Sequence, residues 1–227
     1  MSPANSAFVV TIDGPAGAGK STTARLLADS LGYVFLDTGA IYRTVALLAQ
    51  RRGVAWDAAE DLGSLAANLD LRFEPTEAGV LVLADGQDVT SAIRLPEISQ
   101  GASRVSAHGP VRQGLLQLQR RIGDSGKVVA EGRDTGTVIF PLAQAKFYLT
   151  AEAQVRAERR AAELIAKGTP ATVEKTLAEI LERDARDSQR AVAPLRKADD
   201  AVEIDTGHQG PTQVVAQMVN LVRTRGG

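Results

Sequence analysis

Apolar residues along the chain follow two patterns, short continuous runs and stripes that repeat every three or four positions. The continuous runs are typical of buried parallel strands, and we expect strands at 7–13, 33–37, 127–131, 146–150 and 201–205. The stripes predict a helix at 22–31 and a second one that follows the strand at 33–37 and continues to about 51. They predict further helices at 57–68, 95–107, 110–123, 152–166, 172–188 and 212–222. Because helices separate successive strands, the pattern predicts an α/β fold with about five parallel strands flanked by helices.

Residues 69–93 follow a different pattern. They form three short, partly alternating segments at 69–75, 79–84 and 87–93, and Asp85-Gly86 before the third segment is typical of a hairpin turn. We therefore expect a small antiparallel insertion between the second and third strands of the parallel sheet. His108, which stands next to a Gly-Pro pair, is expected to be a loop residue rather than a catalytic base.

The first predicted strand leads directly into a glycine-rich loop. The sequence Gly-Pro-Ala-Gly-Ala-Gly-Lys-Ser at 14–21 fits the P-loop pattern G-x-x-x-x-G-K-[ST]. In a P-loop, glycines let backbone N–H groups turn toward a phosphate, and the next helix adds its positive dipole end. Lys20 supplies a positive charge for the transferred phosphoryl group, and the Ser21 hydroxyl is a candidate Mg²⁺ ligand. The predicted nucleotide-phosphate site comprises Gly14, Pro15, Ala16, Gly17, Ala18, Gly19, Lys20, Ser21 and Thr22.

Several arginines lie in segments that could contribute to the predicted phosphate site. Arg133 and Asp134 follow the strand at 127–131, and we expect them near the P-loop because ligands bind beyond the carboxyl ends of parallel strands. At about 100° per residue, one side of the helix at 172–188 and its continuation would carry Arg183, Arg186, Asp187 and Arg190. Taken alone, this segment favours a helix side that faces solvent, on which Arg183 and Asp187 form an i,i+4 ion pair. Further arginines at 43, 133, 156, 159 and 160 favour guanidinium clamps on phosphate instead.

Composition limits the classes of protein that fit. The 227 residues are 44% hydrophobic and 23% charged, which is typical of a globular protein. The net charge of −1 argues against an extended nucleic-acid surface, and the lack of cysteine excludes disulfides. The N-terminus lacks a basic region, and no apolar stretch is long enough for a signal peptide or a membrane span. We expect a cytoplasmic monomer without nucleic-acid or membrane partners, since no large apolar patch or coiled coil is evident.

Two other classes of function compete with a kinase. Asp-Thr-Gly occurs at 37–39, 134–136 and 205–207, and paired aspartates in such turns form the active site of aspartic proteases. Those enzymes are almost all β, whereas Asp37 falls between a predicted buried strand and a helix. A GTPase-like switch or an ATP-driven binding module would also use a P-loop. The chain has no Asn-Lys-x-Asp motif for guanine, which counts against the switch.

Four stretches resemble bacterial cytidylate kinases, which are P-loop nucleoside monophosphate kinases. They are the P-loop at 12–21, Leu-Asp-Thr-Gly-Ala-Ile-Tyr-Arg at 36–43, Glu-Gly-Arg-Asp-Thr-Gly-Thr-Val at 131–138, and 183–195, Arg-Asp-Ala-Arg-Asp-Ser-Gln-Arg-Ala-Val-Ala-Pro-Leu. The resemblance covers essentially the whole chain and implies transfer of the γ-phosphoryl group from ATP to CMP or dCMP, with Mg²⁺. A P-loop kinase for adenylate, thymidylate or a small metabolite is the alternative.

The resemblance also implies a role for individual residues. The residues that match the family's base contacts are Ser103, Arg112 and Asp134, and those that match its pentose contacts are Arg183 and Asp187. The acceptor phosphate would be held by Arg43, Arg133 and Arg190, within a substrate site that includes Thr38 and Tyr42. Arg156, Arg159 and Arg160 fall in what resembles a mobile lid, and the resemblance implies that an arginine of this group, with Arg159 as the candidate, contacts ATP. The implied catalytic residues are Lys20, Arg133 and Arg190.

A division of the chain follows from the same resemblance. We expect one P-loop kinase domain over 1–227, with a core made of 7–37, 124–151 and 190–227. Residues 38–123 would bind the monophosphate and include the β insertion at 69–93. Residues 152–189 would form the lid and the helix that follows it.

Overall fold

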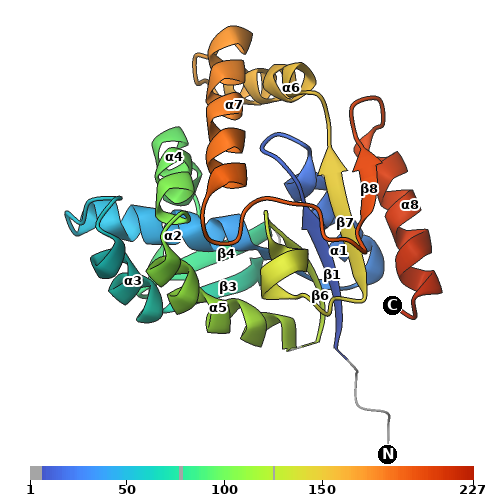
Figure 1. Cartoon of the computed structure of the whole chain (residues 1–227), viewed down its shortest axis with the longest axis horizontal. Helices are drawn as coiled ribbons and strands as arrows, with labels where there is room; N and C mark the ends of the chain where they lie inside the picture. The colour runs from blue at the N-terminus through green and yellow to red at the C-terminus, as the bar shows by residue number, and fades with distance from the viewer. Residues whose placement is uncertain (1–6, 77–78, 125) are drawn as a thin grey trace, which may run out of the picture. The chain divides into compact units, whose positions relative to one another are not determined.

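The computed structural model describes residues 7–76, 79–124 and 126–227 (Figure 1). The chain divides into two compact units. One combines the chain up to Asp37 with Arg120–Gly227, and the other is Thr38–Gln119. Residues 1–6, where we expect no targeting signal, lie outside the described residues. The assignment of 38–123 to monophosphate binding and of 152–189 to a lid stays a prediction.

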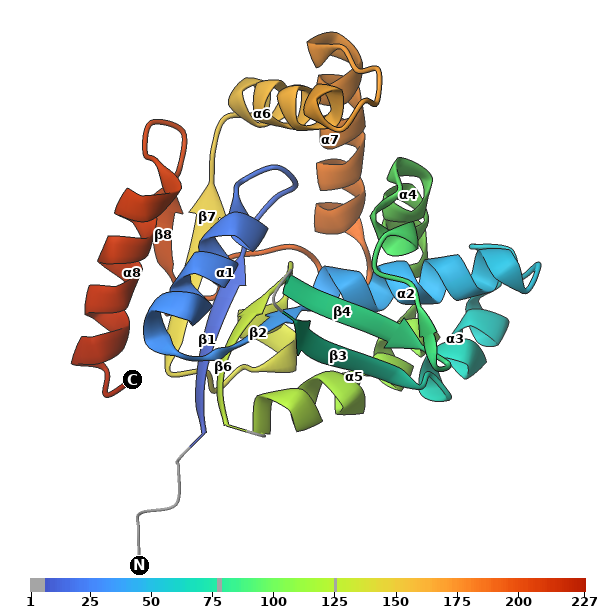
Figure 2. The same ribbon diagram turned by 180° about the vertical axis from the view of Figure 1, so that it is seen from behind.

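The first unit is built on a parallel sheet (Figure 2). Among the described residues its five strands lie in the order β2-β6-β1-β7-β8, and each neighbouring pair is parallel. The strands span Phe8–Asp13 (β1), Val34–Asp37 (β2), Lys127–Glu131 (β6), Ala145–Thr150 (β7) and Val202–Asp205 (β8). The predicted α/β class with a parallel sheet flanked by helices is therefore confirmed.

Helices α1 (Lys20–Leu31) and α8 (Pro211–Thr224) pack against each other and against the sheet. Leu27 of α1 and Met218 of α8 form a buried core with Val10, Ile12 and Phe147 of the central strands. These side chains are the apolar stripes and continuous apolar runs on which the predicted elements rest. Their burial removes apolar surface from water and stabilises the unit.

Helices α6 (Ala153–Ala166) and α7 (Val173–Gln189) pack against each other. The apolar spacing of the sequence would place Leu181 on the buried side of α7 with Leu177 and Ile180, but 52% of Leu181 is exposed. The buried side of α7 instead follows Thr176, Ile180 and Asp187. Two polar residues on the buried side show that α7 is positioned by hydrogen bonds and ion pairs as well as by apolar contact.

Strand β1 occupies the centre of the sheet, where the order of the strands reverses. β6 and β2 lie on one side of it, and β7 and β8 lie on the other. Ligands of open α/β sheets bind beyond the carboxyl ends of the strands at such a reversal. The Gly132 N–H donates to the Ile12 carbonyl across 3.0 Å, so the segment after β6 lies against the end of β1, as we expect.

The second unit contains helices and a small antiparallel sheet. Its helices are α2 (Thr38–Arg51), α3 (Ala59–Ala67), α4 (Pro96–Val105) and the larger part of α5 (Gly109–Asp124). Its strands are β3 (Leu71–Thr76), β4 (Gly79–Ala84) and β5 (Gln87–Asp88). Ala84 pairs with Gln87, so Asp85 and Gly86 form a two-residue turn with φ values of 49° and 74°. This is the predicted hairpin turn, in the left-handed conformation of a type I′ turn.

The expected third strand at 87–93 is too long. β5 ends at Asp88, whose Oδ1 accepts the Thr90 N–H across 2.8 Å, and such an Asx turn diverts the backbone from the strand direction. A short 3₁₀ helix, Ala92–Arg94, follows. His108 lies in a loop as predicted, with its Nε2 atom 2.9 Å from the Trp56 carbonyl.

We predict that Gly101→Ala destabilises the second unit, because an added Cβ would lie 2.6 Å from the Trp56 ring. Overpacking of this kind typically costs about 1–3 kcal/mol. The Trp56 indole donates to the Ala46 carbonyl across 3.0 Å, so displacement of the ring should also change its fluorescence. Trp56 is the chain's one tryptophan, and urea unfolding followed by its emission measures both effects. Glu97→Ala on the exposed side of α4 is the control, and an unchanged midpoint for Gly101→Ala would contradict the prediction.

Candidate functional site

The P-loop joins β1 to α1 at the centre of the first unit. Gly14, Gly17 and Gly19 have φ values of 146°, 77° and 80°, which favour glycine, and α1 begins at Lys20. A Cβ on Gly14 would lie 2.1 Å from the Leu149 carbonyl oxygen, so the loop passes directly against β7. The strand, glycine-rich loop and helix that the motif requires are all present.

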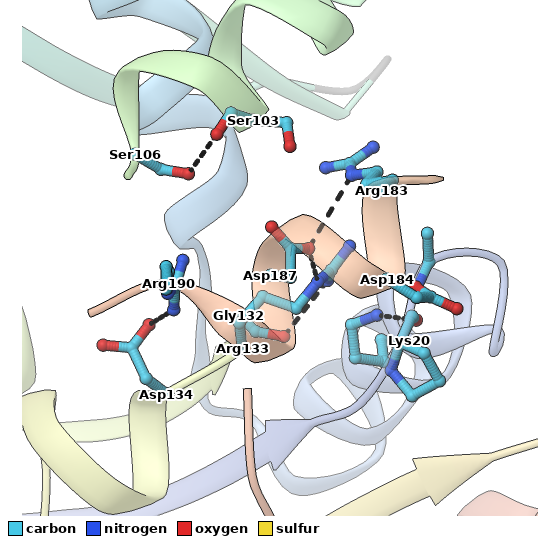
Figure 3. A network of polar contacts seen from close by, with 12 residues as sticks. Lys20, Ser103, Ser106, Gly132, Arg133, Asp134, Arg183, Asp184, Asp187 and Arg190 are labelled. Carbon is cyan, nitrogen blue, oxygen red and sulfur yellow. Dashed lines mark hydrogen bonds and ion pairs between the residues drawn. The ribbon is translucent and has the colours of Figure 1, made fainter. Parts of the chain in front are cut away.

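Lys20 is buried at the base of the loop, with 6% of the residue exposed. Its Nζ donates to the Pro15 carbonyl across 2.6 Å (Figure 3). Burial lowers the pKa of Lys20 well below its ordinary value, and the charge of Arg133 lowers it further, while Glu131 and Asp13 raise it. The ammonium therefore stands among other charged groups and close to the backbone that would surround a phosphate.

Ser21 and Thr22, in the first turn of α1, are exposed. In the described part of the chain no group of three His, Cys, Asp or Glu side chains could hold a metal ion. Mg²⁺ in nucleotide sites is held by few protein groups together with phosphate oxygens and water, so an exposed hydroxyl at this position fits that mode of binding.

Asp13, the last residue of β1, connects the P-loop to the segment after β6. Its Oδ1 accepts the backbone N–H and the hydroxyl of Thr135, each across 2.8 Å, and its Oδ2 accepts the Gly136 N–H across 2.8 Å. Burial raises the pKa of Asp13, and these hydrogen bonds oppose the rise. The bonds fix a five-residue π-helix, Thr135–Ile139, that the sequence did not predict. Asp13 itself was also missed, although a buried aspartate at the end of an apolar strand, directly before the P-loop, is a signal.

Asp187 of α7 lies between two arginines (Figure 3). Its Oδ2 is 2.9 Å from Arg133 Nε and 3.9 Å from Arg183 Nε. Burial raises the pKa of this carboxyl, but Arg133 and Arg183 outweigh burial and hold the pKa below its ordinary value. The structure thus joins three predicted site residues from two segments in one ionised cluster.

Arg190 and Asp134 form a second buried pair. Arg190 Nη2 donates to Asp134 Oδ1 across 3.1 Å, and each side chain is 4% exposed. α7 ends at Gln189, and Arg190 has an extended backbone, so the helical spacing that placed it beside Arg183 and Asp187 does not apply to it. Arg186 forms an ion pair with Glu182 on the same helix.

The three arginines of α6 have separate partners. Arg156 donates to the Ala16 carbonyl and to Asp184. Arg159 donates to the Thr206 and Gly207 carbonyls, across 2.6 and 3.2 Å. Arg160 pairs with Glu163 on its own helix. Arg159 therefore lies close to the P-loop, because the Thr206 hydroxyl donates to the Ala18 carbonyl across 3.2 Å.

The second unit brings together several of its own predicted residues. Arg112 Nη1 donates to the Ser106 carbonyl across 3.2 Å, and the Ser106 hydroxyl donates to the Ser103 carbonyl across 3.1 Å. The Arg112 guanidinium also lies 5.5 Å from the centre of the Tyr42 ring, a cation–π distance. Thr38 is buried at the start of α2, and Arg43 is half-buried one turn later.

The sheet order excludes Asp37 and Asp205 as the paired aspartates of a protease. Asp37 ends β2 and Asp205 ends β8, and these strands are at opposite edges of the five-stranded sheet. Neighbouring strands are about 4.8 Å apart, so the two aspartates are several strand widths apart and cannot share a proton. Asp134 is paired with Arg190.

Comparisons with known proteins give matches over nearly the whole chain. Residues 10–224 match the family model for cytidylate kinase. The chain is 50% identical to a cytidylate kinase of Syntrophotalea carbinolica over 221 residues, which covers 97% of this chain and 94% of the relative. It is 49% identical to a cytidylate kinase of Geobacter sulfurreducens over 218 residues, 96% of this chain and 94% of the relative. A solved structure of an uncharacterised protein from Eubacterium ventriosum is similar with a TM-score of 0.52 at 10% identity, covering 96% and 99% of the two chains.

In the described residues no helix has the length and apolar character of a membrane span.

We predict that Asp187→Asn lowers the stability of the first unit in a pH-dependent way. The folded-state pKa of Asp187 lies below its unfolded value, so its stabilisation is present above the unfolded pKa and is lost as pH falls through the folded one. At neutral pH the variant should be less stable by about 1–3 kcal/mol. The difference should shrink below about pH 4.

Urea unfolding of both proteins from neutral to acid pH measures this difference. Asp29→Asn, at an exposed position on α1, is the control and should match the unsubstituted protein. A difference that stays constant across the pH range would show that the charge of Asp187 is not what stabilises the cluster.

Proposed function

The chain belongs to the cytidylate kinase family, and we propose that it transfers the γ-phosphoryl group of ATP to CMP or dCMP, giving ADP and CDP or dCDP. The observation that carries this proposal is the family match over 10–224, which includes both the P-loop and the arginine clusters. It makes the chain an ATP-dependent kinase, a transferase with a phosphate group as acceptor. The guanine-nucleotide switch, the ATP-driven binding module and the protease are all disfavoured by this match.

The reaction needs charge compensation more than it needs a base. The phosphate of a nucleoside monophosphate is already an anionic nucleophile near neutral pH, so no histidine is required to deprotonate it. The obstacle is repulsion between two polyanions that must be brought into line. Arginines and a lysine in a site shielded from water oppose that repulsion and stabilise the charge of the transition state.

The P-loop is proposed to hold ATP through its backbone amides and the positive end of α1. Lys20, which lies next to the Pro15 carbonyl, would move its ammonium onto the transferred phosphoryl group. Ser21, exposed in the first turn of α1, is proposed to hold Mg²⁺. When bound, the metal would neutralise part of the charge of the phosphates.

The arginine clusters of the first unit are proposed to hold the acceptor. Arg133 and Arg190 would bind its phosphate, and their carboxylate partners fix the direction of each guanidinium. Asp187 and Arg183 would contact the pentose. Roles for Ser103, Arg112, Thr38, Tyr42 and Arg43 in acceptor binding, and for Arg159 in ATP binding, stay predictions from the family resemblance.

Asp134 is proposed to recognise cytosine. A carboxylate accepts a hydrogen bond from the N4 amino group, which uracil replaces with a carbonyl oxygen. Because the Asp134 side chain is 4% exposed, the wrong base would leave buried polar groups without partners, and this is a strong basis for discrimination.

A coupled assay of ADP formation tests the proposed function directly. Purified protein is given ATP and Mg²⁺ with CMP, dCMP, UMP, AMP or dTMP in turn, and products are identified by chromatography. We expect CMP and dCMP to be the preferred acceptors, and Lys20→Ala to lose at least about a hundred-fold in turnover. Lys175→Ala, exposed on α7, is the matched control. Preference for another acceptor, or hydrolysis without transfer, would overturn the proposal.

We predict that Asp134→Asn reduces discrimination between CMP and UMP more than it weakens ATP binding. The amide keeps the size of the carboxyl group but loses its charge and one acceptor, so CMP should lose about ten-fold or more in kcat/KM relative to UMP. The measurement is kcat/KM for both acceptors at saturating ATP. Equal losses for CMP and UMP would remove Asp134 from base recognition.

A further inference from the structure

The Ala16 peptide in the P-loop is held by an ion pair from two helices outside the loop. Arg156 of α6 donates from Nη1 to the Ala16 carbonyl across 2.8 Å and to Asp184 Oδ2 across 2.5 Å. Asp184 of α7 accepts the Ala16 N–H at its Oδ1 across 3.1 Å. Both hydrogen-bonding groups of one loop residue are therefore bound by the two members of one ion pair.

This contact is buried and geometrically constrained. The side chains of Arg156 and Asp184 are 8% and 18% exposed, and Arg156 Nε also donates to the Ala151 carbonyl across 2.8 Å. A Cβ on Gly17 would lie 3.0 Å from Arg156 Cβ and 3.2 Å from its carbonyl oxygen, so the loop approaches the backbone of α6 closely. The guanidinium of Arg156 is thus held by hydrogen bonds, and its backbone lies directly against Gly17. Little freedom remains for the loop to shift against α6.

The direction of the loop's carbonyl groups depends on such donors. A phosphate nest needs amide N–H groups that point inward, and carbonyl oxygens on the same side would repel an anion. Ala16 O accepts from Arg156, and Ala18 O lies 3.2 Å from the Thr206 hydroxyl, whose one hydrogen it shares with the Thr150 carbonyl. These donors come from α6 and from the segment after β8, so residues distant in sequence orient the carbonyls of the P-loop.

We propose that Arg156 and Asp184 are positioning residues that set the conformation of the P-loop for ATP by holding the Ala16 peptide. The pair acts through the loop backbone, and the charge of Asp184 is essential because one carboxylate must accept both from Arg156 and from the Ala16 N–H. This inference rests on the proposed function for the identity of the nucleotide. It gives Arg156 a role different from that of Arg159 on the same helix.

Asp184→Asn tests the pair with little change in shape. The amide places a donor where one of two acceptors is needed, so we expect the dissociation constant for ATP with Mg²⁺ to rise about ten-fold or more. The dissociation constant for CMP should stay within about two-fold. Isothermal titration calorimetry measures both constants without turnover. Glu182→Gln on the exposed side of α7 is the control and should bind both nucleotides normally.

A double-variant cycle tests whether the two residues act together. Arg156→Ala, Asp184→Ala and the double variant should each weaken ATP binding, and the double variant should lose little more than either single one, because all three break the same contact. Circular dichroism and thermal unfolding identify folded variants. If the alanine variants do not fold, Asp184→Asn with Arg156→Lys completes the cycle.

Two results would overturn the inference. Normal ATP affinity in folded Asp184→Asn would show that the ion pair does not position the loop. Equal losses of ATP and CMP affinity would show a general structural role instead. Failure of the proposed function looks different, since the unsubstituted protein would then bind ATP without forming CDP or dCDP.

Discussion

Burial of opposite charges at the carboxyl ends of β1 and β6 is the constraint on which the first unit depends. Asp13, Lys20, Glu131 and Asp134 are buried there, although ionised groups are costly to remove from water unless they are paired. Asp13 meets that cost with backbone amides and a hydroxyl, and Asp134 meets it with a guanidinium. Because the segment after β6 must supply these partners, its path against the P-loop is fixed. Charged groups are thus oriented before any phosphate arrives, which is the condition for electrostatic preorganisation.

Helix α7 contributes to this arrangement through one of its sides. Asp184 and Asp187, almost one turn apart, bind the P-loop and Arg133 respectively, and Arg190 follows directly after the helix. A rigid helical turn therefore connects the loop proposed to hold ATP with an arginine proposed to hold the acceptor. Any movement of α7 would alter both contacts together, and this is a physical route by which the two substrates could influence each other's binding.

Much of the fold was predictable because it follows from local patterns. Continuous apolar runs such as Val9-Val10 predicted the parallel strands, and glycine with lysine at fixed spacing predicted the P-loop and the start of α1. The end of β5 was not predicted, because an Asx turn at Asp88 overrides a β-rich composition. The exposure of Leu181 also depends on tertiary packing, since its spacing fits a stripe whose buried side is partly polar.

The site was less predictable from the sequence than the fold, because its geometry depends on contacts between distant segments. Helical spacing and the family resemblance pointed to a set of arginines and to the Arg183–Asp187 pair, but not to the pairing of Arg133 with Asp187 or of Arg190 with Asp134. Asp13 and Asp184 acquire their roles from residues more than one hundred positions away, and no local pattern carries that information. Arg190 illustrates the same limit, because its pairing with Asp134 depends on where α7 ends.

The two outermost strands of the parallel sheet, β2 and β8, are each four residues long. Unpaired strand margins can recruit other chains by continuing the hydrogen-bond ladder, and short strands offer few groups for such recruitment. β8 also carries the charged side chains of Asp205 and of Glu203, which pairs with Lys197, and charged side chains on an edge strand discourage pairing with another chain. The short strands at both edges of the sheet that carries the P-loop therefore protect the folded protein against aggregation through this sheet.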